Sequence, residues 1–249
     1  MTFYPVTAFL LFPLMIVMVL LGRYSRGKHT DVAISAPTEG AVFALFGLLL
    51  AFTFSGAISR FDDHRKLIVE EANDISTAYL RLDLLPAAAQ PELRQDFREY
   101  AAIREHRFDE VPESPQSIDA AEKSERLQRQ IWSRSLAAGT SPGANPDANK
   151  LLLPALNAMI DITATRRNAF NMHPPAIIFL LLYVFSAACA YMAGYSMEIG
   201  KQHWMYTLSL ALTVTLTVYA TLEVEYPRRG LIRLTTQNEV FPELIDSMK

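Results

Sequence analysis

The fold of this chain is decided by the stretch GAVFALFGLLLAFTFSGAIS, residues 40–59, and by its continuation RFDDHRKLIVEEANDISTAYLRLDLLP, residues 60–86. The first part carries no charged residue, and its 20 residues are the length that a helix needs to cross a bilayer. The second part keeps the helical period while charges appear, and it contains no Gly or Pro before Pro86. We predict one continuous helix that leaves the bilayer at Arg60 and continues into water.

Three other segments of the chain also lack charged residues: 1–22, 168–197 and 204–222. Charges gather between Arg60 and Arg167, so the mean hydropathy of the whole chain is only +0.14. We therefore predict an all-α membrane protein with four transmembrane helices and a cytoplasmic helical bundle inserted between spans two and three. The expected parts are spans one and two in 1–58, the cytoplasmic region in 59–172, spans three and four in 173–222, and a cytoplasmic tail in 223–249.

Helix boundaries within the polar region are marked by proline and by loop-forming residues. Pro86 should end the long helix, and Pro91 is well placed in the first turn of the next. A third helix should begin near Ser117, and the Gly, Pro and Asn content of GTSPGANPDAN, residues 139–149, predicts a loop. A fourth helix should follow from about Lys150.

The composition also argues against several classes of function. The net charge of −3 gives no basic surface for nucleic acid. Cys189 is the only cysteine, the five His are scattered, and no group has the spacing of metal ligands. We expect no enzyme activity, because no nucleophile–base pair is evident, and no cofactor or metal.

Basic residues near the ends of the spans predict the orientation of the chain. Four of them fall on one side and eight on the other, namely Arg60, Arg65, Lys66, Arg166, Arg167, Arg228, Arg229 and Arg233. The positive-inside rule then places both termini and the polar region in the cytoplasm of a bacterium, with the spans in the inner (plasma) membrane.

Two stripes run along the second span at helical spacing. The first is a small-residue face that would let another helix approach closely, formed by Gly40, Ala44, Gly47, Ala51 and Ser55. The second is apolar and comprises Phe43, Phe46, Leu50 and Phe54. Apolar stripes in a span are most often packing or lipid-facing surfaces.

Hydroxyl and acidic side chains mark the fourth span. Hydroxyls recur at every fourth residue at Ser209, Thr213, Thr217 and Thr221. They either line a water-filled path or donate hydrogen bonds to the backbone carbonyl four residues earlier. A four-residue step drifts around a helix of 3.6 residues per turn, so the stripe does not face one axis throughout. Glu223 and Glu225 follow at the membrane edge, where an acid needs a partner. The candidate partners are Arg228, Arg229, Arg60 and Arg65, in an ion vestibule or in a boundary ion pair.

A polar clamp is expected between the first and fourth helices of the polar region. Asn157 and Asp161 lie four residues apart on an otherwise apolar helix, so burial of Asp161 would require a partner. The long helix offers Glu71, Asn73 and Arg81 as candidates, and Arg166 belongs to the same cluster.

Four segments together resemble the bestrophin-like family of bacterial membrane proteins: residues 60–86, LLPALNAMIDITATRR (152–167), NMHPPAI (171–177) and EYPRRGLIRL (225–234). The resemblance extends from Gly40 to Leu234. It implies four spans, a cytoplasmic helical region and, by the more distant analogy with true bestrophins, a homopentameric anion channel. In those channels the pore neck is an apolar ring on the second span, and the positions that match it here are Phe46, Leu50 and Phe54.

The function expected from these features is an oligomeric ion channel that conducts small ions through the lipid bilayer, with a preference for anions implied by the resemblance alone. Two alternatives remain open. One is a proton-channel subunit of the flagellar-stator or Ton-energiser type, which would require a small single-span partner. The other is a membrane scaffold or sensor whose cytoplasmic helices bind a protein.

Overall fold

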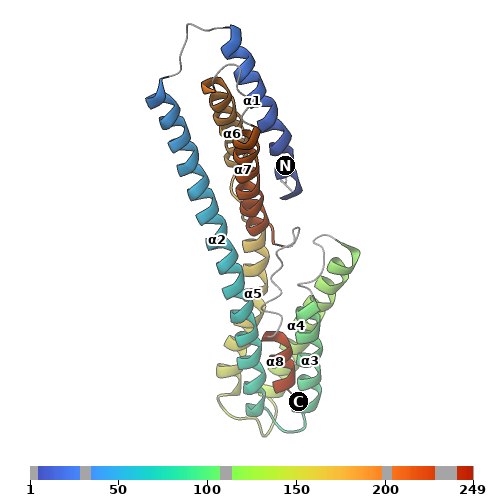
Figure 1. The fold of residues 1–249 in the computed structure, drawn as a ribbon. Helices are drawn as coiled ribbons and strands as arrows, with labels where there is room; N and C mark the ends of the chain where they lie inside the picture. Colours follow the sequence, from blue (N-terminus) through green and yellow to red (C-terminus); the bar gives the residue numbers. More distant parts are fainter. Residues whose placement is uncertain (1–4, 29–34, 107–113, 198–203, 228–239, 249) are drawn as a thin grey trace. The chain divides into compact units, whose positions relative to one another are not determined.

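The structure is a computed structural model that describes residues 5–28, 35–106, 114–197, 204–227 and 240–248. Within these ranges the regular elements are all helical (Figure 1). They are η1 (Pro5–Leu10), α1 (Leu11–Lys28), α2 (Ala36–Leu80), η2 (Arg81–Leu84), α3 (Gln90–His106), α4 (Pro115–Gly139), α5 (Ala148–Asn171), α6 (Ala176–Ser196), α7 (Trp204–Glu225) and α8 (Val240–Ser247). The chain divides into an apolar unit, residues 1–61 with 173–232, and a polar unit, residues 62–172 with 233–249.

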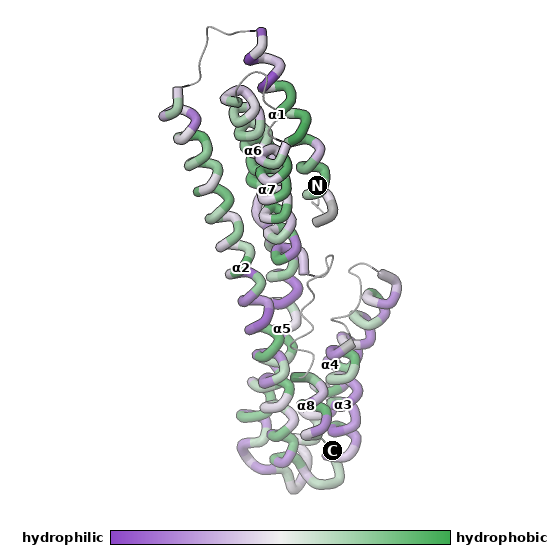
Figure 2. Tube along the Cα trace, viewed as in Figure 1, coloured by the Kyte–Doolittle hydropathy of each residue, from purple (hydrophilic) through white to green (hydrophobic). Residues whose placement is uncertain are grey.

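The long helix expected from residues 40–86 is confirmed. α2 runs without interruption for 45 residues and passes Arg60 as a regular helix, and its last turn tightens into η2 before Pro86. Ser35 precedes it and accepts hydrogen bonds from the backbone of its first turn. Figure 2 shows the change from hydrophobic to hydrophilic residues along this one helix.

Four helical runs contain a stretch that is long and apolar enough to cross a membrane, which confirms the expected number of spans. They lie within Thr7–Lys28, Ala36–Leu84, Ala148–Ser196 and Trp204–Glu225. The first run starts as the 3₁₀ helix η1 and becomes α-helical only at Leu11. Pro13 then falls in the first α-helical turn, where its missing N–H costs no hydrogen bond.

The apolar unit is held together by close packing of α1 on α6. Ser186, Ala190 and Gly194 recur at every fourth residue of α6 and are all buried. A Cβ on Gly194 would lie 2.0 Å from the carbonyl oxygen of Val19, and one on Gly22 would lie 2.1 Å from that of Tyr191. The two backbones therefore meet at glycine on both sides, as small residues permit in lipid-embedded helix pairs.

The polar unit has its own hydrophobic core. It is formed by the second part of α2 together with α3, α4, α5 and α8, with Phe97, Tyr100 and Ile131 at its centre. The start of α4 shows how local sequence sets these helices: Ser114 caps the backbone N–H of Ser117, and Pro115 occupies the first helical position.

α8 lies in this core, although the sequence analysis assigned its residues to a tail. Phe241, Leu244 and Met248 are buried in it. The backbone carbonyl of Met248 accepts hydrogen bonds from the Tyr79 hydroxyl at 2.8 Å and from Arg98 Nη1 at 2.9 Å. The C-terminal helix is thus an integral element of the polar unit.

Candidate functional site

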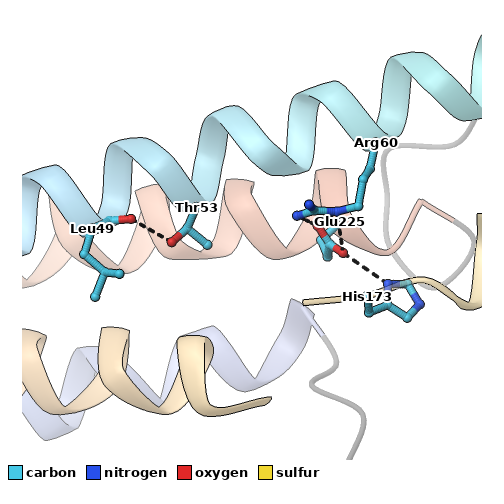
Figure 3. A network of polar contacts seen from close by, with 5 residues as sticks. All are labelled: Leu49, Thr53, Arg60, His173 and Glu225. Carbon is cyan, nitrogen blue, oxygen red and sulfur yellow. Dashed lines mark hydrogen bonds and ion pairs between the residues drawn. The ribbon is translucent and has the colours of Figure 1, made fainter. Parts of the chain in front are cut away.

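An ion pair between α2 and α7 lies where the uncharged stretch of α2, residues 40–59, ends. Arg60 is the first charged residue after that stretch, and Glu225 is the last residue of α7. Arg60 Nη2 lies 2.6 Å from Glu225 Oε2, and Arg60 Nε lies 3.0 Å and 3.1 Å from Oε2 and Oε1 (Figure 3). The carboxylate is 1% exposed and the guanidinium side chain 32%. Such a two-point contact fixes both side chains.

His173 is the third member of this site. Its Nδ1 lies 3.1 Å from Glu225 Oε1, and its ring contacts the ring of Tyr226 with centroids 4.5 Å apart. His173 stands just before Pro174, in the segment that leads into α6. A single buried carboxylate therefore joins α2, α7 and the start of the third span (Figure 3).

The position of the Arg60 guanidinium depends on a glycine one turn earlier. Side chains of a helix lean towards its N-terminus, so Arg60 reaches back towards Gly56. A Cβ on Gly56 would lie 3.3 Å from Arg60 Nη1 and 3.4 Å from Nη2. The absence of a side chain at residue 56 leaves the guanidinium room to lie against the helix surface and reach Glu225.

The sequence analysis named Arg60 and Glu225 as candidate partners but missed His173. The signal lay in the quoted segment NMHPPAI, where a histidine directly precedes two prolines at the start of a span. Prolines fix the direction in which a chain enters a helix, so a polar residue before them is held in a defined place. The sequence does not give the rotation of α7 about its axis, so it could not show that Glu225 faces His173.

The other predicted charges at the membrane edge lie elsewhere. Glu223 is buried in α7. Arg65 lies 3.6 Å from Asp62 of its own helix. Arg228 and Arg229 fall outside the described residues. Within the ranges that the structure describes, no group of three or more His, Cys, Asp or Glu residues could hold a metal ion.

The small-residue face of α2 is uncovered in the single chain. All five of its residues are exposed, and a Cβ on Gly40 or Gly47 would meet no atom within 4 Å. Only 17% of the most apolar part of α2 is buried, the lowest share among the four candidate spans. This face is therefore available to a neighbouring molecule.

The neck hypothesis needs a correction at one of its three positions. Phe46 is 6% exposed and belongs to the apolar core of its own chain, beside Phe43 and Leu49. A side chain that lines a pore formed by several copies should be uncovered in a single copy, and Phe46 does not meet this condition. Leu50 is partly buried and Phe54 is exposed, so these two residues stay candidates.

The hydroxyl stripe of α7 winds from the surface into the interior. Ser209 and Thr213 are exposed, Thr217 is half-buried and Thr221 is buried. The hydroxyls of Thr217 and Thr221 each donate to the carbonyl oxygen four residues earlier, both at 2.8 Å. These two hydrogen bonds satisfy hydroxyls in a span without water.

The clamp in the polar unit forms, but around a different carboxylate from the one expected. Glu71 of α2 is fully buried and pairs with Arg104 of α3 and Arg166 of α5. Burial lowers the pKa of the Arg104 guanidinium, and the Glu71 carboxylate supplies its counter-charge. One carboxylate thus ties three helices of this unit together.

The expectation that Asp161 is buried against the long helix is wrong. Asp161 is exposed and accepts a hydrogen bond at 2.9 Å from Asn157 of its own helix. Arg81 donates instead to the carbonyl oxygen of Leu151, and Asn73 is exposed. The apolar face of α5 points into the core, which leaves the Asn157–Asp161 face in solvent.

The family of this chain follows from comparison with known proteins. The family model of the Bestrophin-like domain matches residues 7–238, nearly the whole chain. The chain belongs to the bestrophin-like family. This assignment confirms the resemblance drawn from the sequence, and with the apolar helices it identifies a membrane protein.

Solved structures share the fold of this bestrophin-like protein. A point variant of a bacterial bestrophin homologue from Klebsiella pneumoniae is 13% identical, and the match covers 97% of this chain and 98% of that chain with a TM-score of 0.75. Another structure of a bestrophin homologue from the same organism is 14% identical, over 96% and 98% of the two chains, with a TM-score of 0.73. No curated protein matches the sequence. At these identities the likeness establishes the fold alone.

Proposed function

We propose that this bestrophin-like protein is a subunit of a homo-oligomeric ion channel in a bacterial inner membrane. The polar unit and both termini then lie in the cytoplasm, with that unit inserted between the second and third spans. The proposal rests on the small-residue face of α2, which has no cover in the single chain.

The contrast with the other spans supports this proposal. The uncovered surfaces of α1, α6 and α7 carry large aliphatic side chains suited to lipid, including Leu14, Val17, Leu20, Leu180, Val184, Leu208, Leu212 and Leu216. α2 also exposes large side chains, including Leu45, Leu48 and Phe52, but beside them its small-residue face presents Gly, Ala and Ser. Small residues in a span favour close approach of another helix, or leave room for water beside the backbone.

A ring of identical subunits accounts for such a face. Four helices of one chain do not enclose a path, whereas a closed ring brings the same face of each copy around one axis. Five copies and a preference for anions are proposed by analogy with bestrophins. Leu50 and Phe54 would then contribute the apolar constriction, where an ion passes only if the ring is wide enough to hold water.

Mass and ion flux together test the proposal. Protein purified in detergent should give the mass of a closed oligomer by size-exclusion chromatography with light scattering. After reconstitution, liposomes loaded with chloride should release it without any added protein. A monomer, or an oligomer without flux, would contradict the proposal. Flux only in the presence of a single-span partner would instead favour a proton-channel subunit.

A further inference from the structure

The chain crosses between the apolar and the polar unit after residues 61, 172 and 232. The first crossing lies within α2, and the second lies between α5 and α6. Each unit has its own hydrophobic core, so the crossings are covalent routes by which a change in one unit can reach the other. The side chains next to these crossings therefore influence how tightly the two units are coupled.

Glu225 ties the first two crossings together on their apolar side. Arg60 lies just before the first crossing, and His173 comes directly after the second. Both contact the buried carboxylate of Glu225 (Figure 3). The shorter contacts of Arg60, at 2.6 Å and 3.0 Å, are to Oε2, whereas His173 Nδ1 lies 3.1 Å from Oε1. The carboxylate therefore holds both segments at the same time, mainly through different oxygens.

A ring contact ties the same two segments together on their polar side. His64 of α2 stacks on Phe170 of α5, with ring centroids 4.2 Å apart and ring planes inclined by 6°. His64 is buried, so this stack is a packed contact of the polar unit. His64 follows Arg60 by four residues, and Phe170 precedes His173 by three. Each unit thus holds the two segments close to where they cross.

Both segments are short and stiff between their two ties. α2 passes from Arg60 to His64 as regular helix, a rise of about 6 Å over little more than one turn. On the second segment, Pro174 and Pro175 follow His173 and restrict the backbone where it enters α6. A displacement of the polar-side tie is therefore carried to the Glu225 site instead of being absorbed by a flexible linker.

We propose that the Glu225 site is a joint that couples the polar unit to the membrane spans. Because one carboxylate holds both segments, a change in the core of the polar unit reaches α6 and α7 as well as α2. This inference does not rest on the proposed channel function, and its test does not measure flux. In a channel, the joint would connect the state of the polar unit to the state of the spans.

The chain carries a native reporter for each unit. Cys189, the only cysteine, is buried in the apolar unit, so a thiol reagent reaches it when that unit opens. Trp132 packs against the core of the polar unit, and its fluorescence reports on that unit alone after Trp204→Phe removes the other tryptophan. Denaturation of the full chain in detergent then gives a midpoint for each unit from the same samples.

Phe241→Ala is the perturbation, because Phe241 lies in the core of the polar unit. It should lower the Trp132 midpoint and, through the joint, the Cys189 midpoint as well. In a Glu225→Gln background, the same perturbation should shift the Cys189 midpoint by less than about half as much, since sites without a shared tie act independently. His173→Ala removes one of the two partners and should give an intermediate shift, which keeps the test available if Glu225→Gln does not fold.

Glu39 provides a matched control in the same unit. It lies in the first turn of α2, and its carboxylate accepts a hydrogen bond from the Ser196 hydroxyl at 2.7 Å, far along the chain from the crossings. Glu39→Gln should leave the transmitted shift unchanged. The proposal would be overturned if Phe241→Ala did not move the Cys189 midpoint in the chain with native Glu225, or moved it equally in the Glu225→Gln background. The same loss of transmission in Glu39→Gln would also contradict it.

Discussion

At the scale of single residues, the Glu225 carboxylate has two partners that approach from different segments. Glu225→Gln keeps the shape of the side chain but removes the charge that balances Arg60. We expect a loss of about 1–3 kcal/mol in the free energy of unfolding, less than for a fully buried pair because Arg60 is partly solvated. The unfolding of the protein in detergent, followed by circular dichroism, measures this loss.

The control is the exposed pair of Lys66 and Asp63, whose atoms lie 3.0 Å apart on the surface of α2. Asp63→Asn should cost less than about 0.5 kcal/mol, since exposed ion pairs contribute little. An equal loss in the two variants would contradict a special role for Glu225.

Two glycines of the apolar unit make opposite predictions. Gly194→Ala would place a methyl group 2.0 Å from the Val19 carbonyl oxygen, so α1 and α6 would have to separate. We expect a loss of about 1–3 kcal/mol from this overpacking, measured by the same unfolding experiment. Gly47→Ala meets no atom within 4 Å and should not weaken the fold of the single chain, because alanine is the better helix former. Equal losses would show that α1 and α6 do not meet at Gly194.

At the scale of elements, the small-residue face of α2 should decide assembly rather than folding. Gly47→Leu adds a bulky side chain to a face that has free space in the single chain. We expect the subunits to dissociate or to change their number, because the backbones of neighbouring copies could no longer approach. Light scattering of the detergent complex measures the change.

Leu216→Ala is the control for assembly, since it alters an exposed residue on the lipid-facing surface of α7. Its complex should keep the mass of the wild type. If Gly47→Leu also keeps that mass, the small-residue face is not a subunit contact.

α8 gives a prediction for the polar unit. Phe241 is buried in its core, so Phe241→Ala should cost about 3–5 kcal/mol in the stability of this unit. Hydrogen exchange of α3, which contacts α8, should increase in the variant. Glu243→Ala changes an exposed residue of the same helix and should leave exchange unaltered. Unchanged exchange after Phe241→Ala would mean that α8 contributes no stability to this unit.

At the scale of the whole molecule, the orientation in the membrane is the open prediction. The count of basic residues predicts that both termini lie in the cytoplasm. A phosphatase reporter fused after Lys249, which is active only in the periplasm, should be inactive, and a fluorescent reporter at the same position should be bright. The reverse result would place the polar unit on the outer side and invert the proposed topology.

The sequence alone determined the solvent of each segment and the position of most helices. The reason is local: a run of uncharged residues partitions into lipid, and a proline or a capping serine often marks the end or the first turn of a helix, although Pro154 lies inside α5. The uninterrupted α2 follows from such signals, and the helix expected to begin near Ser117 begins at Pro115, two residues earlier.

Only the tertiary structure decided which faces meet. In a span both faces are apolar, so hydropathy does not give the rotation of a helix about its axis. The small-residue stripe that the sequence indicated on α2 stays uncovered in the structure, whereas a stripe on α6 that was not predicted packs within the chain. The rotation of α2 buries Phe46, that of α5 exposes Asp161, and that of α7 brings Glu225 to His173. Contacts between distant segments depend on these rotations, because each helix is fixed by its partners rather than by its own residues.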